Sequence, residues 1–279
     1  MERKVDLNFL LEIAIEAAIC AGEKTLEYYL KDIEIITKED SSPLTLADLE
    51  SNRIINEFLK TTGVPILSEE NKMVPYKTRK CWQKFWLVDP LDGTKEFIKK
   101  NSEYSVNIAL IEDCHPILGV VYIPAMGILY YGNKDIGSYK TMVRGFTSLK
   151  SIRKDSLILP LNSELRQNPL ILVSRSHLSD DTKVIIDKIQ SVVGKCLIEP
   201  YGSSLKFCLI AEGRADLYPR IGPTMEWDTA ASHAIIEGAG CGIIQFPDKI
   251  PLVYNKENLL NPSFIVYKKT MEKTLQDII

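Results

Sequence analysis

Acidic side chains end or open apolar elements at four places in the chain. Glu69 follows the run Val-Pro-Ile-Leu-Ser, while Asp89 and Asp92 lie in an Asp-Pro-Leu-Asp-Gly turn after Phe-Trp-Leu-Val. The other two are Asp48, in Pro-Leu-Thr-Leu-Ala-Asp, and Asp228, which opens an apolar helical pattern. Carboxylates in such positions point into clefts, where several of them repel one another unless cations intervene. Because Mg²⁺ is the usual hard cation where phosphate is also bound, the pattern indicates a magnesium site.

The Asp-Pro-Leu-Asp-Gly turn has the residue types needed to aim two carboxylates at one point. Pro90 stiffens it, and Gly93 permits backbone conformations closed to other residues. Taken singly, an Asp-Gly pair is an ordinary turn, and an Asp-Thr pair before a helix is an ordinary N-cap. An EF-hand is excluded, because with Gly93 as the loop glycine its first and third ligands would be Val88 and Pro90. The glycines near position 240 do not spell the dinucleotide-binding fingerprint.

Composition limits the class of protein. The chain has 279 residues, of which 45% are hydrophobic and 25% charged, enough for one large domain or two modest ones. A net charge of -3 argues against a partner nucleic acid, which requires a basic face, although a local basic pocket stays open. We therefore expect a globular protein that takes a small ligand in a cleft.

The six cysteines are widely scattered, with no CxxC pair and no spacing typical of a zinc site. We expect them to be small buried hydrophobic residues of a protein in a reducing compartment. The N-terminal stretch mixes acidic residues into its apolar positions and has no cleavage site of a signal peptide. Proline and glycine interrupt the most apolar segment, residues 116–132, so it cannot supply the ~20 apolar residues of a spanning helix. We expect a cytoplasmic chain without a transmembrane segment. Peripheral association with the inner membrane face, and the choice between monomer and homodimer, stay open.

Hydrophobic periodicity predicts how these residues are positioned. Helical spacing is found over residues 7–30 and 46–60, and the strand-like runs 85–89, 105–111, 117–123 and 128–131 predict an antiparallel meander. Beyond residue 157, strand-like runs (170–174, 195–199, 215–219) alternate with helical ones (179–193, 203–212, 228–238). The weakly patterned stretch 137–168 favours a division into an α+β domain, residues 1–155, and an α/β domain, residues 156–279. We expect the ligand cleft between them.

Three motifs resemble the signatures of the inositol monophosphatase superfamily: Glu69-Glu70, DPLDGTKEF at 89–97 and WDTAA at 227–231. Within it the chain resembles the CysQ-type 3'(2'),5'-bisphosphate nucleotidases along most of its length. Further supporting runs are SPLTLAD (42–48), NIALIE (107–112), PILGVVYIP (116–124), SRSH (174–177), GSSLKFCLIAEG (202–213) and LYPRIGPT (217–224). The resemblance implies a five-layer αβαβα sandwich with its active-site cleft between two halves.

The implied activity is magnesium-dependent hydrolysis of a small phosphorylated nucleotide. Adenosine 3',5'-bisphosphate would yield AMP and phosphate, and its sulfated analogue would react likewise. The reaction would belong to sulfur metabolism, and lithium would inhibit the enzyme. One alternative is a broad phosphomonoesterase like the inositol monophosphatases. Another is a catalytically silent sensor, against which the retention of every motif carboxylate speaks.

The resemblance also implies roles for individual residues. One ion would bind Glu69, Asp89 and the carbonyl of Leu91, and a second would bind Asp89, Asp92 and Asp228, with a looser third ion near Glu69. Asp48 and Thr94, with Glu69, would prepare the attacking water for in-line attack without a phospho-enzyme. The substrate's second phosphate would meet Ser203, Lys206 and Arg220, and His177 would lie near the nucleotide. The remaining implied substrate contacts are Glu69, Leu91, Asp92, Gly93, Thr94 and Asp228.

We also expect Ser203 to start a helix whose terminal amides favour an anion. Two residues depart from the family pattern: Ser232 replaces a usual glycine, and Glu226 adds an acid beside Asp228. The tail 268–279 extends beyond the usual end of the family, as either a short helix or an interaction segment.

Overall fold

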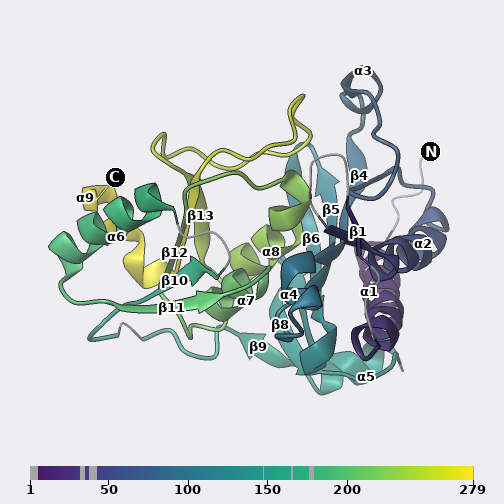
Figure 1. Cartoon of the computed structure of the whole chain (residues 1–279), viewed down its shortest axis with the longest axis horizontal. Coiled ribbons are helices and arrows are strands. Elements are labelled where there is room, and N and C mark those ends of the chain that lie inside the picture. The colour runs from purple at the N-terminus through teal and green to yellow at the C-terminus, as the bar shows by residue number, and fades with distance from the viewer. Residues whose placement is uncertain are drawn as a thin grey trace.

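Two main sheets alternate with three helical layers along the long axis of the chain (Figure 1). The structure is a computed structural model that describes residues 6–31, 35–37, 43–146, 148–164, 166–175 and 179–278. From one end, the layers are α1 (Leu7–Tyr29) with α2 (Leu46–Lys60), a seven-stranded sheet, α7 (Leu205–Ala211) with α8 (Glu226–Gly238), a five-stranded sheet, and α6 (Asp180–Val193) with α9 (Glu272–Ile278). The predicted five-layer αβαβα sandwich is confirmed.

The first helical layer forms as the periodicity predicts. Helix α1 starts after Asp6, whose side chain accepts a hydrogen bond from the backbone N–H of Asn8 at 3.0 Å. Helix α2 starts after Thr45 with a capping box, in which the third helical residue, Asp48, accepts a hydrogen bond from the N-cap backbone. The apolar faces of both helices pack on one side of the seven-stranded sheet. Asp48 is therefore held at a fixed helix terminus.

The seven-stranded sheet is an antiparallel meander from β4 onward, with β3 parallel to β4 at one edge. Its strands are β3 (Ile66–Ser68), β4 (Lys84–Asp92), β5 (Ser105–Glu112), β6 (His115–Ile123), β7 (Ile128–Asn133), β8 (Gly137–Met142) and β9 (Leu157–Leu159). A short separate ladder joins β1 (Ile35–Thr37) to β2 (Pro43–Thr45). The helices α3 (Tyr76–Arg79), α4 (Thr94–Ile98) and α5 (Leu149–Lys154) lie in the connections.

The weakly patterned stretch 137–168 is more regular than its sequence suggests. It contains β8, α5 and β9, and both strands belong to the larger sheet. Strand β8 lacks the hydrophobic alternation that predicts a strand, because some of its buried side chains are polar. The hydroxyl of Ser138, for example, donates to the carbonyl of Ile235 at 2.7 Å. Since β9 lies beyond residue 155 and still pairs with β8, the elements on either side of the proposed boundary share one sheet. The division at 155/156 stays a prediction.

The five-stranded sheet has the order β11-β10-β12-β14-β13, with β10, β11 and β12 parallel. Its strands are β10 (Leu170–Ser174), β11 (Leu197–Tyr201), β12 (Leu217–Arg220), β13 (Gly242–Gln245) and β14 (Phe264–Tyr267). Strands β11 and β12 begin two residues later than the runs 195–199 and 215–219 predict. Pairing with β10 sets the register of β11, and hydrophobicity could not, because most of this edge strand is exposed.

The central layer belongs to both sheets. Helix α8 lies against β5, β6 and β7, while α7 packs on β12 and β14. A glycine in β6 permits the close approach, because a Cβ on Gly119 would lie 2.0 Å from the carbonyl oxygen of Ala231. One apolar core joins side chains from both sheets and from both central helices. The elements that carry the candidate site therefore meet around one shared core.

The C-terminal segment completes the outermost layer. Lys268 is buried and donates to the carbonyl of Glu164, and α9 packs against α6 with Met271 and Leu275 buried. Of the two alternatives for this tail, the described part, up to residue 278, is a short docked helix. Ser232 is buried on α8, and its hydroxyl finds no hydrogen-bond partner among the described residues.

Candidate active site

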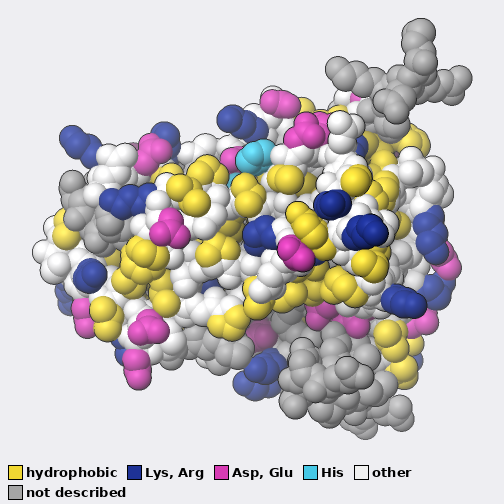
Figure 2. Space-filling model, turned by 90° about the horizontal axis from the view of Figure 1, so that it is seen from above, with side chains coloured by type: hydrophobic (Ala, Val, Ile, Leu, Met, Phe, Trp, Pro, Cys, Tyr) yellow, Lys and Arg dark blue, Asp and Glu magenta, His cyan; other side chains and the backbone are white. Residues whose placement is uncertain are grey.

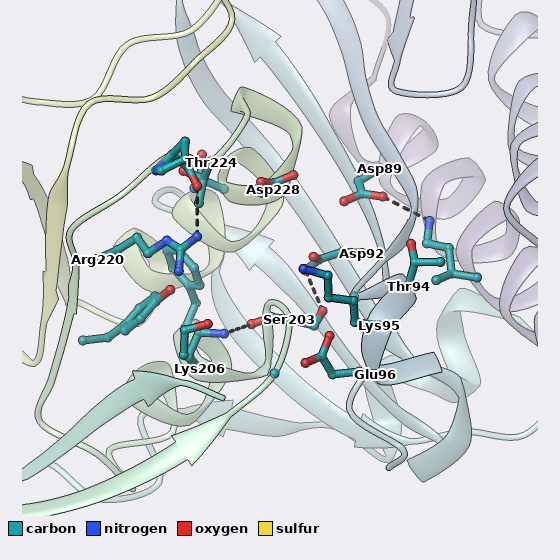
Figure 3. A pocket seen from close by; sticks show the side chains of 18 of the residues that line it. Asp89, Asp92, Thr94, Lys95, Glu96, Ser203, Lys206, Arg220, Thr224 and Asp228 are labelled. Atoms are coloured by element: carbon teal, nitrogen blue, oxygen red, sulfur yellow. Dashed lines mark hydrogen bonds between the residues drawn. The ribbon is translucent and has the colours of Figure 1, made fainter. Parts of the chain in front are cut away.

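A cleft of about 300 Å³ lies between the ends of the two main sheets, and it brings most of the predicted site residues together. Figure 3 shows Asp89, Asp92 and Thr94 on one side of it and Arg220 and Lys206 on the other. The full lining is Glu69, Asp89, Leu91, Asp92, Gly93, Thr94, Lys95, Glu96, Ser174, Gly202, Ser203, Lys206, Phe207, Tyr218, Arg220, Pro223, Thr224, Asp228, Thr229 and Phe264.

A β-bulge aims Asp89 and Asp92 at the same side. In the ladder between β4 and β5, Asp89 pairs with Asn107 and Asp92 with Ser105. The chain therefore advances three residues on β4 for two on β5, which is a β-bulge. On a regular strand, side chains three residues apart point to opposite faces, and the extra residue of the bulge turns both to the same face. Pro90, which has no N–H to donate, lies inside this irregularity. Gly93 then takes a φ of +87°, which starts α4 and places Thr94 at the cleft.

Asp89 lies at the electrostatic centre of the acidic wall. It is buried, and its Oδ1 accepts a hydrogen bond from the backbone N–H of Leu91 at 3.1 Å. Burial, followed by the charges of Glu69, Asp92 and Asp228, raises the pKa of Asp89 well above its usual range. Four carboxylates with this mutual repulsion form a site that favours cations.

Asp92 is held by donors from two segments of the chain. Its Oδ2 accepts hydrogen bonds from Ser203 at 2.5 Å, Ser204 at 3.0 Å, Asn107 at 3.4 Å and Ser105 at 3.5 Å. The serines at 203 and 204 come from the second half of the chain, and the other two residues come from β5. These contacts fix one carboxylate oxygen and join the two walls of the cleft beneath it.

Asp228 enters the cleft from the first turn of α8. Its Oδ2 accepts the backbone N–H of Met225 at 2.9 Å, which fixes the carboxylate at the helix terminus. Burial, and next the charge of Asp92, raises the pKa of Asp228 well above its usual range. Within the described parts of the chain, no three His, Cys, Asp or Glu side chains converge as a complete metal site. Mg²⁺ needs no such cage, since it keeps several waters and shares phosphate oxygens with its substrate.

Asp48 and Thr94 form the predicted pair. The Thr94 hydroxyl donates to Asp48 Oδ1 at 3.4 Å, while the other carboxylate oxygen accepts Thr45 N at 2.8 Å and Thr45 Oγ1 at 2.6 Å. Thr94 lines the cleft, and the buried Asp48 stands behind it. One oxygen of Asp48 therefore caps α2, and the other faces the threonine.

Two cations occupy the opposite wall. Lys206 is buried, and its Nζ donates to the carbonyls of Ser203 at 2.6 Å and Tyr201 at 3.3 Å, above the ring of Tyr218. Burial lowers the pKa of Lys206 to about 8. Arg220 donates to the carbonyl of Pro223 at 2.9 Å, and its buried Nε has no hydrogen-bond partner among the described residues.

The prediction for Ser203 was wrong in one respect. Helix α7 begins at Leu205 instead of Ser203, and Ser203 has a left-handed φ of +49°. The hydroxyl of Ser203 contacts Asp92, and the N-cap of α7 is the next residue, Ser204. His177 lies outside the described residues. Glu226 lies beside Asp228 in sequence but does not line the cleft.

Several residues that line the cleft were not predicted as site residues from the sequence. Tyr218 lies in the LYPR run, beside the recognised Arg220, and its ring contacts Lys206. Gly202 precedes Ser203, and a Cβ there would lie 2.4 Å from Glu96 Cγ, so this position has room only for glycine. Both residues stand inside motifs that the sequence already singled out. Thr224 likewise ends the run LYPRIGPT, whereas Phe264 lies in no run that the sequence analysis singled out.

With the geometry in place, the class of protein is clear. A profile of the inositol monophosphatase family matches residues 6–278, and the chain belongs to this family. The 3'(2'),5'-bisphosphate nucleotidase CysQ of Salmonella typhimurium is 40% identical over 261 residues, which cover 92% of this chain and 99% of the relative. The crystal structure of CysQ from Bacteroides thetaiotaomicron is 43% identical with a TM-score of 0.86, covering 95% of this chain and 98% of that chain.

A more distant structure agrees in fold alone. An inositol monophosphatase from Zymomonas mobilis is 22% identical, with a TM-score of 0.75 over 99% of both chains. The layered architecture therefore persists where most residues differ.

All six cysteines are free thiols. On the face shown in Figure 2, acidic and basic side chains are interspersed among apolar ones. None of the helices in the described ranges has the length and apolarity needed to cross a membrane.

Proposed function

We propose that the chain is a magnesium-dependent 3'(2'),5'-bisphosphate nucleotidase that hydrolyses adenosine 3',5'-bisphosphate to AMP and phosphate. One observation carries the proposal: one wall of the cleft carries the carboxylates, and the opposite wall carries Lys206 and Arg220. A substrate with two phosphates needs both walls, one for the reacting group and one for the remote group. The similarity to CysQ from two bacteria supports the same substrate class.

We assign the metal ligands to the acidic wall. Glu69, Asp89 and the Leu91 carbonyl would hold one ion, and Asp89, Asp92 and Asp228 a second, with a third near Glu69. The donor set fits Mg²⁺, because it consists of hard oxygen atoms. Burial, followed by the charges of Glu69, Asp92 and Asp228, raises the pKa of Asp89, and bound cations would offset these charges. When bound, magnesium supplies Lewis acidity that stabilises negative charge on the phosphoryl oxygens.

Asp48 and Thr94 would orient the attacking water and accept its proton. A threonine alone is too weak a base at neutral pH, so it needs the acidic partner that lies 3.4 Å away. Thr45 fixes the far oxygen of Asp48, which leaves Oδ1 directed at the threonine hydroxyl. The proton can thus leave the water through Thr94 toward a carboxylate that α2 holds in place.

Lys206 and Arg220 would hold the second, unreactive phosphate. The Nε donor of Arg220 is buried and has no partner among the described residues, which supports a role in binding a ligand oxygen. Lys206 adds a positive charge that its backbone contacts direct toward the loop before α7. Ser203 would contribute mainly through Asp92, and His177 remains a proposed nucleotide contact.

A substrate panel tests the proposal. Phosphate release is measured with adenosine 3',5'-bisphosphate, its sulfated analogue, inositol phosphate and fructose bisphosphate, each with and without Mg²⁺. The proposal predicts the highest kcat/KM for the nucleotides. Equal rates on inositol phosphate would indicate the broad phosphomonoesterase instead, and no hydrolysis at all would indicate a sensor.

Replacing Arg220 should impair only substrates that carry the second phosphate. Loss of one charge-assisted contact costs ~1.5 to 3 kcal/mol, so Arg220→Ala should lower kcat/KM for adenosine 3',5'-bisphosphate about 10- to 100-fold. Adenosine 3'-monophosphate should react with both proteins at nearly the same rate, as in a double-mutant cycle. Arg214→Ala, at an exposed arginine, is the matched control. Equal losses on both substrates would assign Arg220 a structural role.

The same wall should produce a pH dependence. Because burial lowers the pKa of Lys206 to about 8, its charge is present below this pH and is lost above it. The kcat/KM for adenosine 3',5'-bisphosphate should therefore fall as pH rises through about 8, more steeply than for the monophosphate. Lys206→Arg keeps its charge and should remove this difference between the substrates. Parallel profiles for the two wild-type reactions would count against a charged Lys206 at the second phosphate.

We place the reaction in the cytoplasm. Six free thiols agree with a reducing cytoplasm, where the reaction would serve sulfur metabolism and be inhibited by lithium. The substrate would be the principal partner, with the chain acting as a monomer or a homodimer. Any association with a membrane would be peripheral, at its inner face.

A further inference from the structure

The segment between β13 and β14 packs against the start of α8. We call residues Tyr254–Asn261 the clamp segment. The carbonyl of Leu259 accepts a hydrogen bond from the backbone N–H of Glu226 at 2.9 Å. The backbone N–H of Asn261 donates to the carbonyl of Thr224 at 2.8 Å. The Asn261 side chain adds a hydrogen bond to the carbonyl of Met225 at 2.8 Å. The backbone on both sides of the helix terminus is thus tied to one segment.

Glu226 is the main side-chain contact of α8 to this segment. It is fully buried, and its Oε2 accepts Asn255 N at 2.6 Å. Its Oε1 accepts Lys256 N at 2.9 Å and Lys256 Nζ at 2.6 Å. Residues two apart on a helix point in different directions, so Glu226 turns away from the cleft while Asp228 enters it. The acid therefore fixes the turn from behind.

The clamp segment is also bonded to Arg79 on α3. The buried guanidinium donates from Nη1 to Asn255 Oδ1 at 2.8 Å and from Nη2 to the carbonyl of Glu257 at 2.9 Å. In return, Asn255 Nδ2 donates to the carbonyl of Arg79 at 2.8 Å. One connected set of hydrogen bonds therefore runs from α3 through the clamp segment to the turn that holds Asp228.

We propose that Glu226 is a positioning residue for Asp228, acting through the clamp segment and Arg79. The inference rests on the proposed role of Asp228 as a metal ligand. A displacement near 1 Å at a reacting centre can cost about 100-fold in rate, so the turn needs such support. An acid suits the position because each of its contacts is an N–H donor. An amide would set its own NH₂ donor against at least one of them.

The direct test measures metal affinity instead of activity. Mn²⁺ is titrated into the full chain without substrate, and free Mn²⁺ is followed by electron paramagnetic resonance. Changes to residues that orient metal ligands typically weaken metal binding ~10- to 100-fold, and Glu226→Gln should do the same. The matched control is Glu257→Gln, an identical change at an exposed side chain of the clamp segment, which should bind Mn²⁺ as wild type does. High Mg²⁺ should restore part of the lost phosphate release.

The outcomes separate positioning from simple stability. If Glu226→Gln lowers the Tm of the metal-free chain while its Mn²⁺ affinity equals that of wild type, the positioning role is wrong. If the variant does not fold, Lys256→Met is the second variant. It keeps the backbone donors to Glu226 but removes the Nζ contacts to Glu226, Val253 and Asn261, and it should weaken Mn²⁺ binding to a smaller degree. Unchanged affinity there also overturns the proposal. A wild-type chain that binds Mn²⁺ but releases no phosphate contradicts the proposed function alone. One that binds no Mn²⁺ contradicts both.

Discussion

Asp89→Asn should reduce magnesium-dependent phosphate release by more than about 100-fold, because changes to mere supporting residues of a metal site already cost ~10- to 100-fold. Asp89 is assigned to two ions, and it lies where the charges of Glu69, Asp92 and Asp228 all act on it. An amide keeps the shape and an oxygen donor but loses the charge. The measurement is kcat/KM for adenosine 3',5'-bisphosphate at saturating Mg²⁺.

The same substitution should leave the metal-free chain at least as stable as wild type. Burial and neighbouring carboxylates raise the pKa of Asp89, so the folded state binds its proton more tightly than the unfolded chain does. Stability of the metal-free wild type must then fall as pH rises above the usual carboxyl range, and the variant lacks this contribution. Thermal unfolding in a chelator at two pH values checks the sign. Asp187→Asn, at an exposed position on α6, is the control. Normal turnover in a folded Asp89→Asn chain would refute the metal assignment.

The fold was predictable where one face of an element is apolar and the other is not. Residues 46–60 match α2 at both ends, because Thr45 and Asp48 mark its start as clearly as the apolar stripe marks its face. Strand β8 could not be found this way, since Ser138 and Thr141 are polar and yet buried. Their hydrogen bonds depend on neighbours distant in sequence, such as Ile235, and periodicity carries no information about them.

The candidate site was predictable as a set of residues and much less as a geometry. The motifs identify Asp89 and Asp92, but only the register with β5 shows that a bulge turns both to one side. Ser203 was chosen correctly as a cleft residue for a wrong reason, because its hydroxyl contacts Asp92 and no helix begins there. The sequence showed Glu226 only as an added acid beside Asp228 and gave no sign of its contacts, since its partners lie about thirty residues away in a loop. Such contacts require the fold before they can be recognised.

Thr94→Ala should lower kcat by ~10²- to 10⁴-fold with little change in KM, as expected when a positioned proton acceptor is lost. The hydroxyl lies at the cleft, 3.4 Å from Asp48 Oδ1, and it is the only part of this pair that the substitution removes. Asp48 is a less selective target, because Asp48→Asn would also disturb the cap of α2, where lost caps cost ~1 kcal/mol. Thr94→Ser keeps the hydroxyl and should retain most of the turnover. Steady-state kinetics at saturating Mg²⁺ distinguish the possibilities: a defect confined to KM would place Thr94 in substrate binding instead of water activation.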